Sequence, residues 1–377
     1  EDCIDAVDVE TICILVGMML LVAVIKNSGI FEYIAIKAAK IAKGRPWPIM
    51  VIFILITAVC SGMLDNVTTV LLVGPMTLAI TNILKVDPVP YIITQIMASN
   101  IGGTATLIGD PPNIMIGSAA KLSFVDFILN TGVATVFVII VGLICMYFIY
   151  GRKLFVTDES IAKVMQLDEN KAIKDRKLMH ESVIVIILVA LCFIFHDQLG
   201  VQSCTVAIAA ACIMLLIGGQ EPEEIIADVE WPTILFFIGL FIVVGGMKKV
   251  GVITMLANGL ISITHGNMVV TMMVILWVSA IVSSFLDNIP FVATLIPMIL
   301  TMQSEGMDVA PIWWALSLGA CLGGNGTLIG ASANVVLSGI SKNNGHPITF
   351  GQYFKIGFPM MILSIIVCSV FLLIRFA

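Results

Sequence analysis

The chain has 377 residues, of which 59% are hydrophobic and 12% are charged, and its formal net charge is −6. Soluble domains carry roughly 25% charged residues, so this composition excludes an ordinary soluble fold. Apolar runs of about 20 residues, enough for a helix to cross a bilayer, recur along the chain without the alternation of a transmembrane barrel. The nine cysteines are scattered and form no CxxC pair, so they indicate neither a zinc site nor a disulfide framework. We therefore predict an all-α polytopic membrane protein.

The first half of the chain predicts a series of apolar helices. We expect them over 11–24, 46–63, 67–84 and 130–150, whereas 31–43 has a charged face and predicts a helix at the membrane interface. Asp65-Asn66 joins two of the apolar helices without a polar loop. Two full crossings would leave Asp65 at a membrane surface, whereas a re-entrant hairpin would place this tip at mid-depth.

The apolar segment from 90 to 120 is interrupted at Gly102–Asn113, which holds three glycines, two prolines, two threonines and a carboxylate. Lipid does not tolerate bare backbone, so this stretch predicts a discontinuous helix beside a cavity. It recurs as Gly323–Asn334, with Thr-Leu-Ile-Gly in both copies. A break that appears twice in equivalent places is typical of a transporter substrate site.

Other motifs recur at nearly the same spacing. Asp8-Val9-Glu10 is repeated as Asp228-Val229-Glu230, and Leu64-Asp65-Asn66 as Leu286-Asp287-Asn288, so the copies lie 220 to 222 positions apart. An odd number of crossings separates the copies whether the hairpin spans the bilayer or not. The two halves therefore face opposite ways, which predicts an inverted-topology repeat with two discontinuous helices.

We expect a first repeat over 1–150, a polar linker over 151–180, and a second repeat over 181–377 that includes two preceding scaffold helices, 182–195 and 205–217. The linker is basic and shares one side with Lys37, Lys40, Lys43, Lys85 and Lys342, which makes that side cytoplasmic by the positive-inside rule. The first repeat lacks such scaffold helices, so we expect the natural gene to encode further N-terminal helices. The protein should be a multi-pass integral membrane protein, in the plasma membrane of a prokaryote or an organelle membrane of a eukaryote.

The hairpin tips and helix breaks of both halves should converge near the membrane midplane. Exposed N–H groups at half-helix starts suit an anion and carbonyls at half-helix ends suit a cation such as Na⁺, while the glycines permit close approach and unusual dihedrals. We expect Asp65, Asn66, Asp287 and Asn288 to contribute to a Na⁺ site. The predicted substrate and ion site consists of Asp65, Asn66, Thr68, Gly102, Gly103, Thr104, Thr106, Asp110, Asn113, Asp287, Asn288, Gly323, Gly324, Asn325, Thr327, Ser332 and Asn334.

The carboxylates are the most informative of these residues, because an intramembrane carboxylate costs about 2.5–3.5 kcal/mol. Asp65 and Asp287 can ligate Na⁺ or bind a proton reversibly, or each can cap the helix that follows it, and the two roles can coexist. Asp110 is asymmetric, because its counterpart is Ala331. It is either a proton or cation coupling group or the cap of the second half-helix.

Several stretches resemble the P-protein family within the ion transporter superfamily of the ArsB and NhaD type. They are residues 64–72, 108–113, 284–291, 319–334 and 357–361. The resemblance implies two re-entrant hairpins, a scaffold that dimerises and elevator-type alternating access. The dicarboxylate carriers of this superfamily have Ser-Asn-Thr motifs where this chain has Leu-Asp-Asn, and no arginine or lysine falls in the predicted site. Both features favour exchange of cations or protons, or anion transport coupled to it.

We therefore expect a secondary active transporter, and not an enzyme, that moves a small ion or anion coupled to Na⁺ or H⁺. Its expected partners are the lipid bilayer and a second copy of itself, with no nucleic acid and no cofactor beyond the coupling ion. Alternatives are an arsenite or antimonite efflux permease and a Na⁺-coupled carrier of organic anions such as dicarboxylates, or of amino acids. A passive channel and an intramembrane enzyme using Asp65 and Asp110 are the other classes, and the repeat disfavours the enzyme because it duplicates Asp65 but not Asp110.

Overall fold

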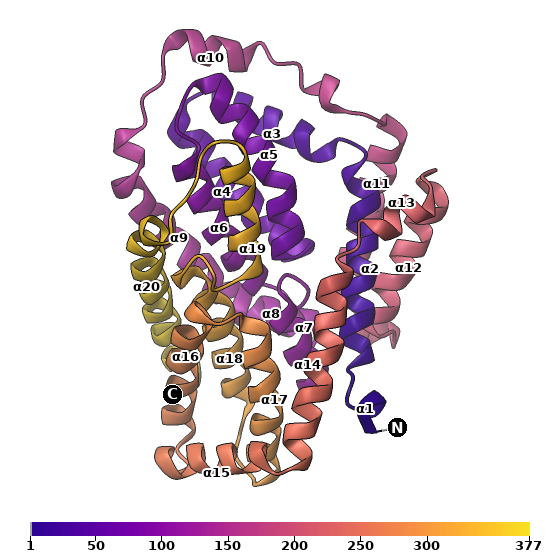
Figure 1. The fold of residues 1–377 in the computed structure, drawn as a ribbon, viewed down its shortest axis with the longest axis vertical. Helices are drawn as coiled ribbons and strands as arrows, with labels where there is room; N and C mark the ends of the chain where they lie inside the picture. Colours follow the sequence, from indigo (N-terminus) through magenta and orange to yellow (C-terminus); the bar gives the residue numbers. More distant parts are fainter. Residues whose placement is uncertain (1) are drawn as a thin grey trace.

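The computed structural model describes residues 2–377, apart from the side chains of residues 2, 3, 196, 197 and 199, and the described chain is helical without a strand. Most helices run along the long axis of the molecule (Figure 1). Within the described residues, eight helices are long and apolar enough to cross a membrane. The predicted all-α polytopic membrane fold is confirmed.

The first half contains α1 (Asp2–Asp5), α2 (Val9–Lys26), α3 (Ile30–Ile41), α4 (Pro46–Met63), α5 (Asn66–Leu84), α6 (Val89–Thr104), α7 (Pro111–Ala120), α8 (Phe124–Phe127), the π-helix η1 (Ile128–Gly132) and α9 (Val133–Ile149). The linker and the helices after it are η2 (Gly151–Lys153), α10 (Asp158–Met165), η3 (Glu169–Ala172), α11 (Arg176–Leu199) and α12 (Ser203–Ile217). The remainder consists of α13 (Pro222–Ala227), α14 (Trp231–Lys249), α15 (Val252–Thr264), α16 (Met268–Phe285), α17 (Asn288–Ser304), α18 (Ala310–Gly323), η4 (Gly324–Gly326), α19 (Ser332–Asn343) and α20 (Phe350–Phe376).

Two hairpins enter the molecule from opposite ends. In Figure 1, α4 and α5 descend from the top and α16 and α17 rise from the bottom, and their tips meet in the middle. Beside each hairpin runs a broken helix, α6–α7 for the first and α18–α19 for the second. The alternative left open by the sequence, two full crossings joined at Asp65, is therefore not what the chain forms. The inverted repeat with two re-entrant hairpins and two discontinuous helices is confirmed.

Matched hydrogen bonds hold each hairpin to its broken helix. The Ser61 hydroxyl donates to the Ser99 carbonyl at 2.6 Å, and in the second half the Ser283 hydroxyl donates to the Ala320 carbonyl, also at 2.6 Å. These serines lie in α4 and α16 and the carbonyls in α6 and α18. The repeat visible in the motifs thus extends to individual atoms of the packing.

The first glycine of each pair serves this packing, and in the first half neither Gly102 nor Gly103 forms the break. Helix α6 continues through Gly102 and Gly103 to Thr104, so the expectation that the interruption begins at Gly102 is wrong. A Cβ on Gly102 would lie 2.1 Å from the Ala58 carbonyl oxygen of α4, and one on Gly323 would lie 2.6 Å from that of Ala280. Neither glycine of either pair has a positive φ. The close approach that we expected is present, and the unusual dihedrals are not.

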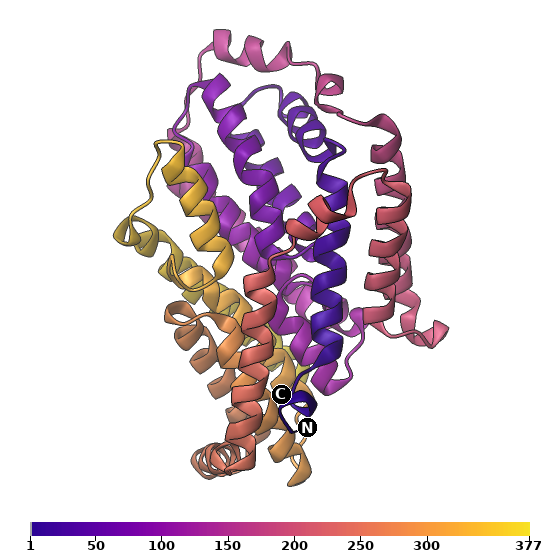
Figure 2. The ribbon, with the colours of Figure 1, turned by 45° about the vertical axis from the view of Figure 1, so that its right-hand side comes forward.

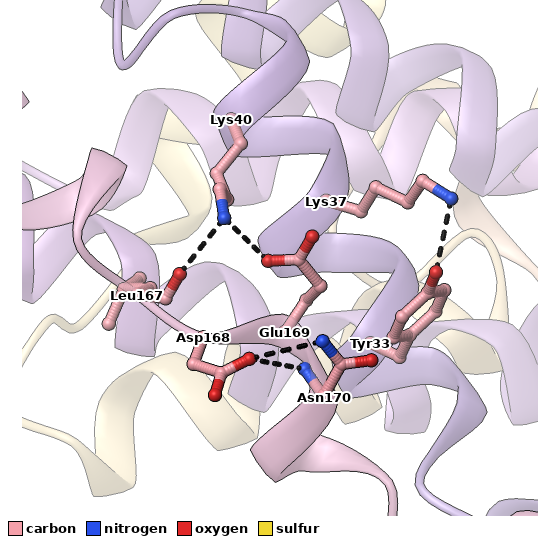
Figure 3. Close-up of polar contacts among 7 residues, drawn as sticks. All are labelled: Tyr33, Lys37, Lys40, Leu167, Asp168, Glu169 and Asn170. Carbon is pink, nitrogen blue, oxygen red and sulfur yellow. Dashed lines mark hydrogen bonds and ion pairs between the residues drawn. The ribbon is translucent and has the colours of Figure 1, made fainter.

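The linker crosses one end of the molecule and is held against α3 (Figures 1 and 3). The Lys40 ammonium donates to the Glu169 carboxylate at 2.6 Å and to the Leu167 carbonyl at 3.2 Å. Further along the linker, the Lys174 amide donates to the Ser28 carbonyl at 3.0 Å. A charged side chain and a backbone bond therefore tether a polar segment that the sequence presents only as a connection.

Helices α2 and α14 begin the two halves and have different surroundings. Helix α2 packs along α12 (Figure 2). A Cβ on Gly17 would lie 2.7 Å from the Ala207 carbonyl carbon. Helix α14 contacts α15, α17 and α2. The Lys26 ammonium at the end of α2 lies 2.6 Å from the Asp228 carboxylate, just before α14. These helices flank the hairpins and border the site described next.

Candidate functional site

The first residues of α5, α7, α17 and α19 meet around one small cavity of about 30 Å³. Each helix start carries a positive dipole end, so this arrangement gathers four such ends in the middle of the molecule. The polar residues that line the cavity are Asp65, Asn66, Asp110, Glu230, Thr233, Asn288 and Ser332. Of the predicted site residues, five therefore share this cavity, and Glu230 and Thr233 join them.

Asp65 is the cap of α5. Its two carboxylate oxygens accept hydrogen bonds from the Thr68 amide at 2.8 Å and the Thr68 hydroxyl at 2.6 Å. The predicted site residue Thr68 is therefore a partner of the Asp65 cap. Its backbone has φ 131° and ψ 163°, a region that side chains other than glycine avoid at a cost of about 1–3 kcal/mol. The capping role that the sequence allowed is present, and Asp65 also lines the cavity, where the residue is 7% exposed.

Asp287 adopts a different geometry at the equivalent tip. Its φ is −55°, an ordinary value, and its carboxylate accepts from the Ile289 amide at 3.0 Å and from the Ser332 hydroxyl at 3.0 Å. Asp287 is half-buried and does not line the cavity. Two identical Leu-Asp-Asn tips are therefore not equivalent in this conformation.

Asp110 occupies the cap position of α7 but does not cap it with its side chain. The residue is 1% exposed, and the Asn288 amide nitrogen lies 3.5 and 3.4 Å from its two carboxylate oxygens. Pro111 and Pro112 follow, so the first turn of α7 has two fewer N–H donors. Of the two roles open to Asp110, helix capping by the side chain is absent, and its carboxylate faces the other half of the chain.

The helix breaks are braced by two equivalent asparagines. The Asn113 amide donates to the carbonyls of Gly103 at 3.3 Å, Thr104 at 3.2 Å and Thr106 at 2.9 Å. In the second half, the Asn334 amide donates to the carbonyls of Gly324 at 2.7 Å and Thr327 at 2.9 Å. These donors satisfy carbonyls that the interruption would otherwise leave without partners. Asn113 and Asn334 thereby stabilise the irregular backbone.

The two threonines of the breaks tie them to the hairpins. The Thr106 hydroxyl donates to the Gly62 carbonyl at 2.5 Å, and the Thr327 hydroxyl donates to the Ser284 carbonyl. Thr104 is buried and donates back to the Asn100 carbonyl within α6. These predicted site residues therefore lie behind the cavity, as supports for the backbone around it.

Asn100 connects the halves and was not predicted. Its amide donates to the side-chain oxygens of Asn325 and Asn334, each at 2.9 Å, and its own oxygen lies 3.4 Å from the Asn66 amide nitrogen. The available signal was a fully polar side chain in an apolar helix, just before the paired glycines. Its counterpart in the repeat is Cys321, so comparison of the two halves gives no hint of it.

Asn113 has different neighbours from its twin Asn334. Its side-chain oxygen accepts from the Ser317 hydroxyl at 2.6 Å and from the Cys321 thiol at 3.5 Å. Asn100 therefore bridges to the second half at Asn334, whereas Ser317 and Cys321 bridge to the first half at Asn113.

Among residues 2–377, no group of three or more His, Cys, Asp or Glu side chains is placed to hold a metal ion. A Na⁺ ion at the cavity would therefore be held by one or two carboxylates together with amide and hydroxyl oxygens. Asp65, Asn66, Asn288 and Ser332 supply such groups.

Two re-entrant hairpins and two broken helices of inverted topology, meeting at a buried polar cavity, define a multi-pass membrane transporter. Residues 1–319 match the family model described as citrate transporter (CitMHS), and the chain belongs to this family, within the ion transporter superfamily of the ArsB and NhaD type.

Several relatives match over nearly the whole chain. An uncharacterised transporter of Mycobacterium tuberculosis is 42% identical over 98% of this chain and 87% of its own length. A 46 kDa membrane protein of Mycobacterium leprae is 39% identical over 98% of this chain and 87% of its own length. The P protein of Homo sapiens is 32% identical over 98% of this chain, which spans 54% of that protein. The resemblance to the P-protein family is confirmed.

A solved structure shares the fold. The crystal structure of the YdaH transporter of Alcanivorax borkumensis, described as having an unusual topology, matches 95% of this chain and 84% of its own with a TM-score of 0.66. The sequence identity is 15%.

Proposed function

We propose that this protein is a secondary active transporter that moves a small ion or anion coupled to Na⁺ or H⁺, in the manner of a Na⁺/H⁺ antiporter or an ArsB-type carrier. The observation that carries the proposal is the composition of the central cavity. Asp65, Asp110 and Glu230 line it, and no lysine, arginine or histidine does.

Three carboxylates that line one buried cavity are stabilised by a positive charge. Removing an ionised carboxylate from water costs several kcal/mol, and like charges in one cavity raise that cost further. A bound cation or a proton removes the penalty. A cavity needs roughly 10–15 Å³ to hold one water molecule, so the volume of about 30 Å³ suits a single small ion in this conformation.

Elevator-type alternating access is the mechanism that we propose. The Ser61 and Ser283 hydrogen bonds join each hairpin to its broken helix, and the Asn100 amide joins the two halves. We expect this unit to move as a body against α2, α12 and α14. A homodimer through the flanking helices, as implied by the family resemblance, would keep the stationary part fixed in the bilayer.

A second candidate is an organic anion carrier, because the family description names citrate. The start of α19 favours an anion: Ala331 precedes it, no side chain caps it, and it has no proline in place of an N–H donor. Dicarboxylates, amino acids, arsenite and antimonite are the other substrates to be tried. Citrate itself would need a larger cavity than the one in this conformation.

Reconstitution into proteoliposomes tests the proposal. Na⁺ or H⁺ gradients are imposed, and uphill movement of Na⁺, H⁺, citrate, succinate, arsenite and glutamate is measured. Transport driven uphill by either gradient supports a carrier. Flux that follows only its own gradient would indicate a channel and defeat the proposal. Asp65→Asn and Asp287→Asn should lower ion-dependent transport while the protein still folds.

A further inference from the structure

The two copies of the Asp-Val-Glu motif have different surroundings. Glu230 stands at the start of α14 and lines the central cavity together with Asp65, Asp110 and Asn288. Its carboxylate accepts from the Thr233 hydroxyl at 3.1 Å. It is the one carboxylate at the cavity that comes from neither a hairpin nor a broken helix.

The equivalent residue, Glu10, lies in the first turn of α2, which begins at Val9. It lines a separate cavity of about 270 Å³ together with Lys121 and Gln202. Asp8 caps α2 by accepting from the Thr11 amide at 3.2 Å and the Thr11 hydroxyl at 2.7 Å. One motif copy therefore faces the central cavity and the other faces elsewhere.

An inverted repeat relates these two environments. When the halves of such a protein exchange conformations, the molecule converts into its oppositely facing form. Glu230 shares the cavity with the hairpin tip of the other half, Asp65. The exchanged form would bring Glu10 to the hairpin tip of the other half, Asp287, and release Glu230.

We propose that Glu230 is a positioning residue for the transported or coupling cation in the conformation described here, and that Glu10 takes this role beside Asp287 in the opposite conformation. This inference rests on the proposed function and adds which residues of the flanking helices serve each face. A carboxylate on the flanking helices attracts the ion to the cavity from one side, and its withdrawal lets the ion leave on the other.

The effect need not require direct ligation. Two unit charges interact about four times more strongly at an effective dielectric constant of about 20 than they do in water. A charge at the cavity wall therefore alters ion affinity even where oxygens of the hairpin and broken helix hold the ion. Loss of Glu230 should act only in the conformation in which it lines the cavity.

The experiment compares Glu230→Gln and Glu10→Gln in proteoliposomes of known orientation, with Na⁺ as the probe and a trapped pH-sensitive dye as the readout. The half-saturating Na⁺ concentration is measured from each face. Glu230→Gln should raise it at least about tenfold on one face, and Glu10→Gln on the other face. Glu230→Asp should recover most of the affinity, and thermal unfolding in detergent establishes that the variants fold.

Equal changes on both faces, changes of both variants on the same face, or no change in either variant would overturn the inference while leaving the carrier intact. A wild-type protein without Na⁺- or H⁺-driven flux of any kind would instead defeat the proposed function, and this inference with it.

Discussion

Asp110 and Asn288 face each other across the boundary between the two halves, with the Asn288 amide nitrogen 3.5 and 3.4 Å from the two carboxylate oxygens. Asp110 immediately precedes α7, and Asn288 is the first residue of α17 in the second hairpin. The hairpin tip of the second half thus contacts the Asp110 carboxylate of the first half. Because the repeat places Ala331 where Asp110 would recur, this contact exists on one side only.

Replacing Asp110 with asparagine should weaken ion-coupled transport without unfolding the protein. The amide keeps the shape but cannot hold a proton or balance a cation, so we expect ion-driven transport to fall by on the order of tenfold or more, since about 1.4 kcal/mol of ion binding is worth tenfold. Gradient-driven flux in proteoliposomes measures this. Asp158→Asn, in the exposed start of α10, is the matched control and should transport normally. An Asp110→Asn protein that transports as fast as the Asp158→Asn protein would contradict the prediction.

Packing of the first hairpin should depend on Gly102. An added methyl group would meet the Ala58 carbonyl at 2.1 Å, so Gly102→Ala should lower stability by about 1–3 kcal/mol through overpacking. Gly142 lies within α9, and nothing stands within 4 Å of a Cβ built there. Gly142→Ala should therefore leave stability unchanged or raise it by up to about 1 kcal/mol. Thermal unfolding in detergent compares the two, and equal melting temperatures would refute the role given to Gly102.

Much of this architecture was predictable because the same motifs occur in both halves of the sequence. Two Leu-Asp-Asn tips and two Gly-Gly…Asn breaks, nearly constant in spacing, suffice to predict two hairpins, two broken helices and inverted topology. The exact end of α6 was not predictable, because glycine is a poor helix former in isolation. Contact with Ala58 favours the helix at Gly102, and that contact is a property of the packed molecule.

The residues missed at the site depend on contacts between distant segments. Asn100 contacts Asn325 and Asn334, which lie more than 200 positions away in the sequence. The equivalent residue in the second half is Cys321, so comparing the two repeats, which revealed the other residues, does not reveal Asn100. Glu230 stands at an ordinary helix start, and only the packing of α14 beside the hairpin tips brings it to the cavity. The inequality of Asp65 and Asp287 is likewise invisible in two identical tripeptides.

The bridge from Asn100 should contribute to stability. Asn100→Ala leaves the buried side-chain oxygens of Asn325 and Asn334 without this donor, which costs about 1–3 kcal/mol for each unsatisfied group. Thermal unfolding should show a clear loss. The control is Asn344→Ala, because the Asn344 amide is exposed and donates to the Ile340 carbonyl at 2.9 Å. Similar melting temperatures for the two variants would show that Asn100 is not a structural bridge.

The linker tether should respond to mutation and to acid. Lys40→Ala removes the donor to Glu169 and Leu167, so backbone hydrogen exchange over the linker should accelerate (Figure 3). Lys163→Ala breaks an ion pair with Glu159 within α10 and should leave the tether in place. The hydrogen bond from Lys40 lowers the pKa of Glu169 below its ordinary value.

A lowered pKa means that the tether is fully present at neutral pH. It should be lost only as the pH falls through the lowered pKa of Glu169, because protonation removes the charge that Lys40 binds. Protection of the wild-type linker amides, measured against the intrinsic exchange rate at each pH, should therefore fall in acid and approach that of Lys40→Ala. Linker exchange in the wild type that matches Lys40→Ala already at neutral pH would contradict the tether.

The two hairpin tips offer a test of strain. At Asp65, with φ 131°, glycine relieves a conformation that alanine must retain, and both replacements lose the cap to Thr68. Asp65→Gly should therefore be more stable than Asp65→Ala by about 1–3 kcal/mol. At Asp287, with φ −55°, the same replacements should differ by no more than the few tenths to about 1 kcal/mol that separate glycine from alanine at helix caps. Melting temperatures of the four variants in one detergent decide the matter. If the glycine advantage is no larger at position 65 than at position 287, the strain assigned to Asp65 is absent, and the two tips are interchangeable in structure as well as in sequence.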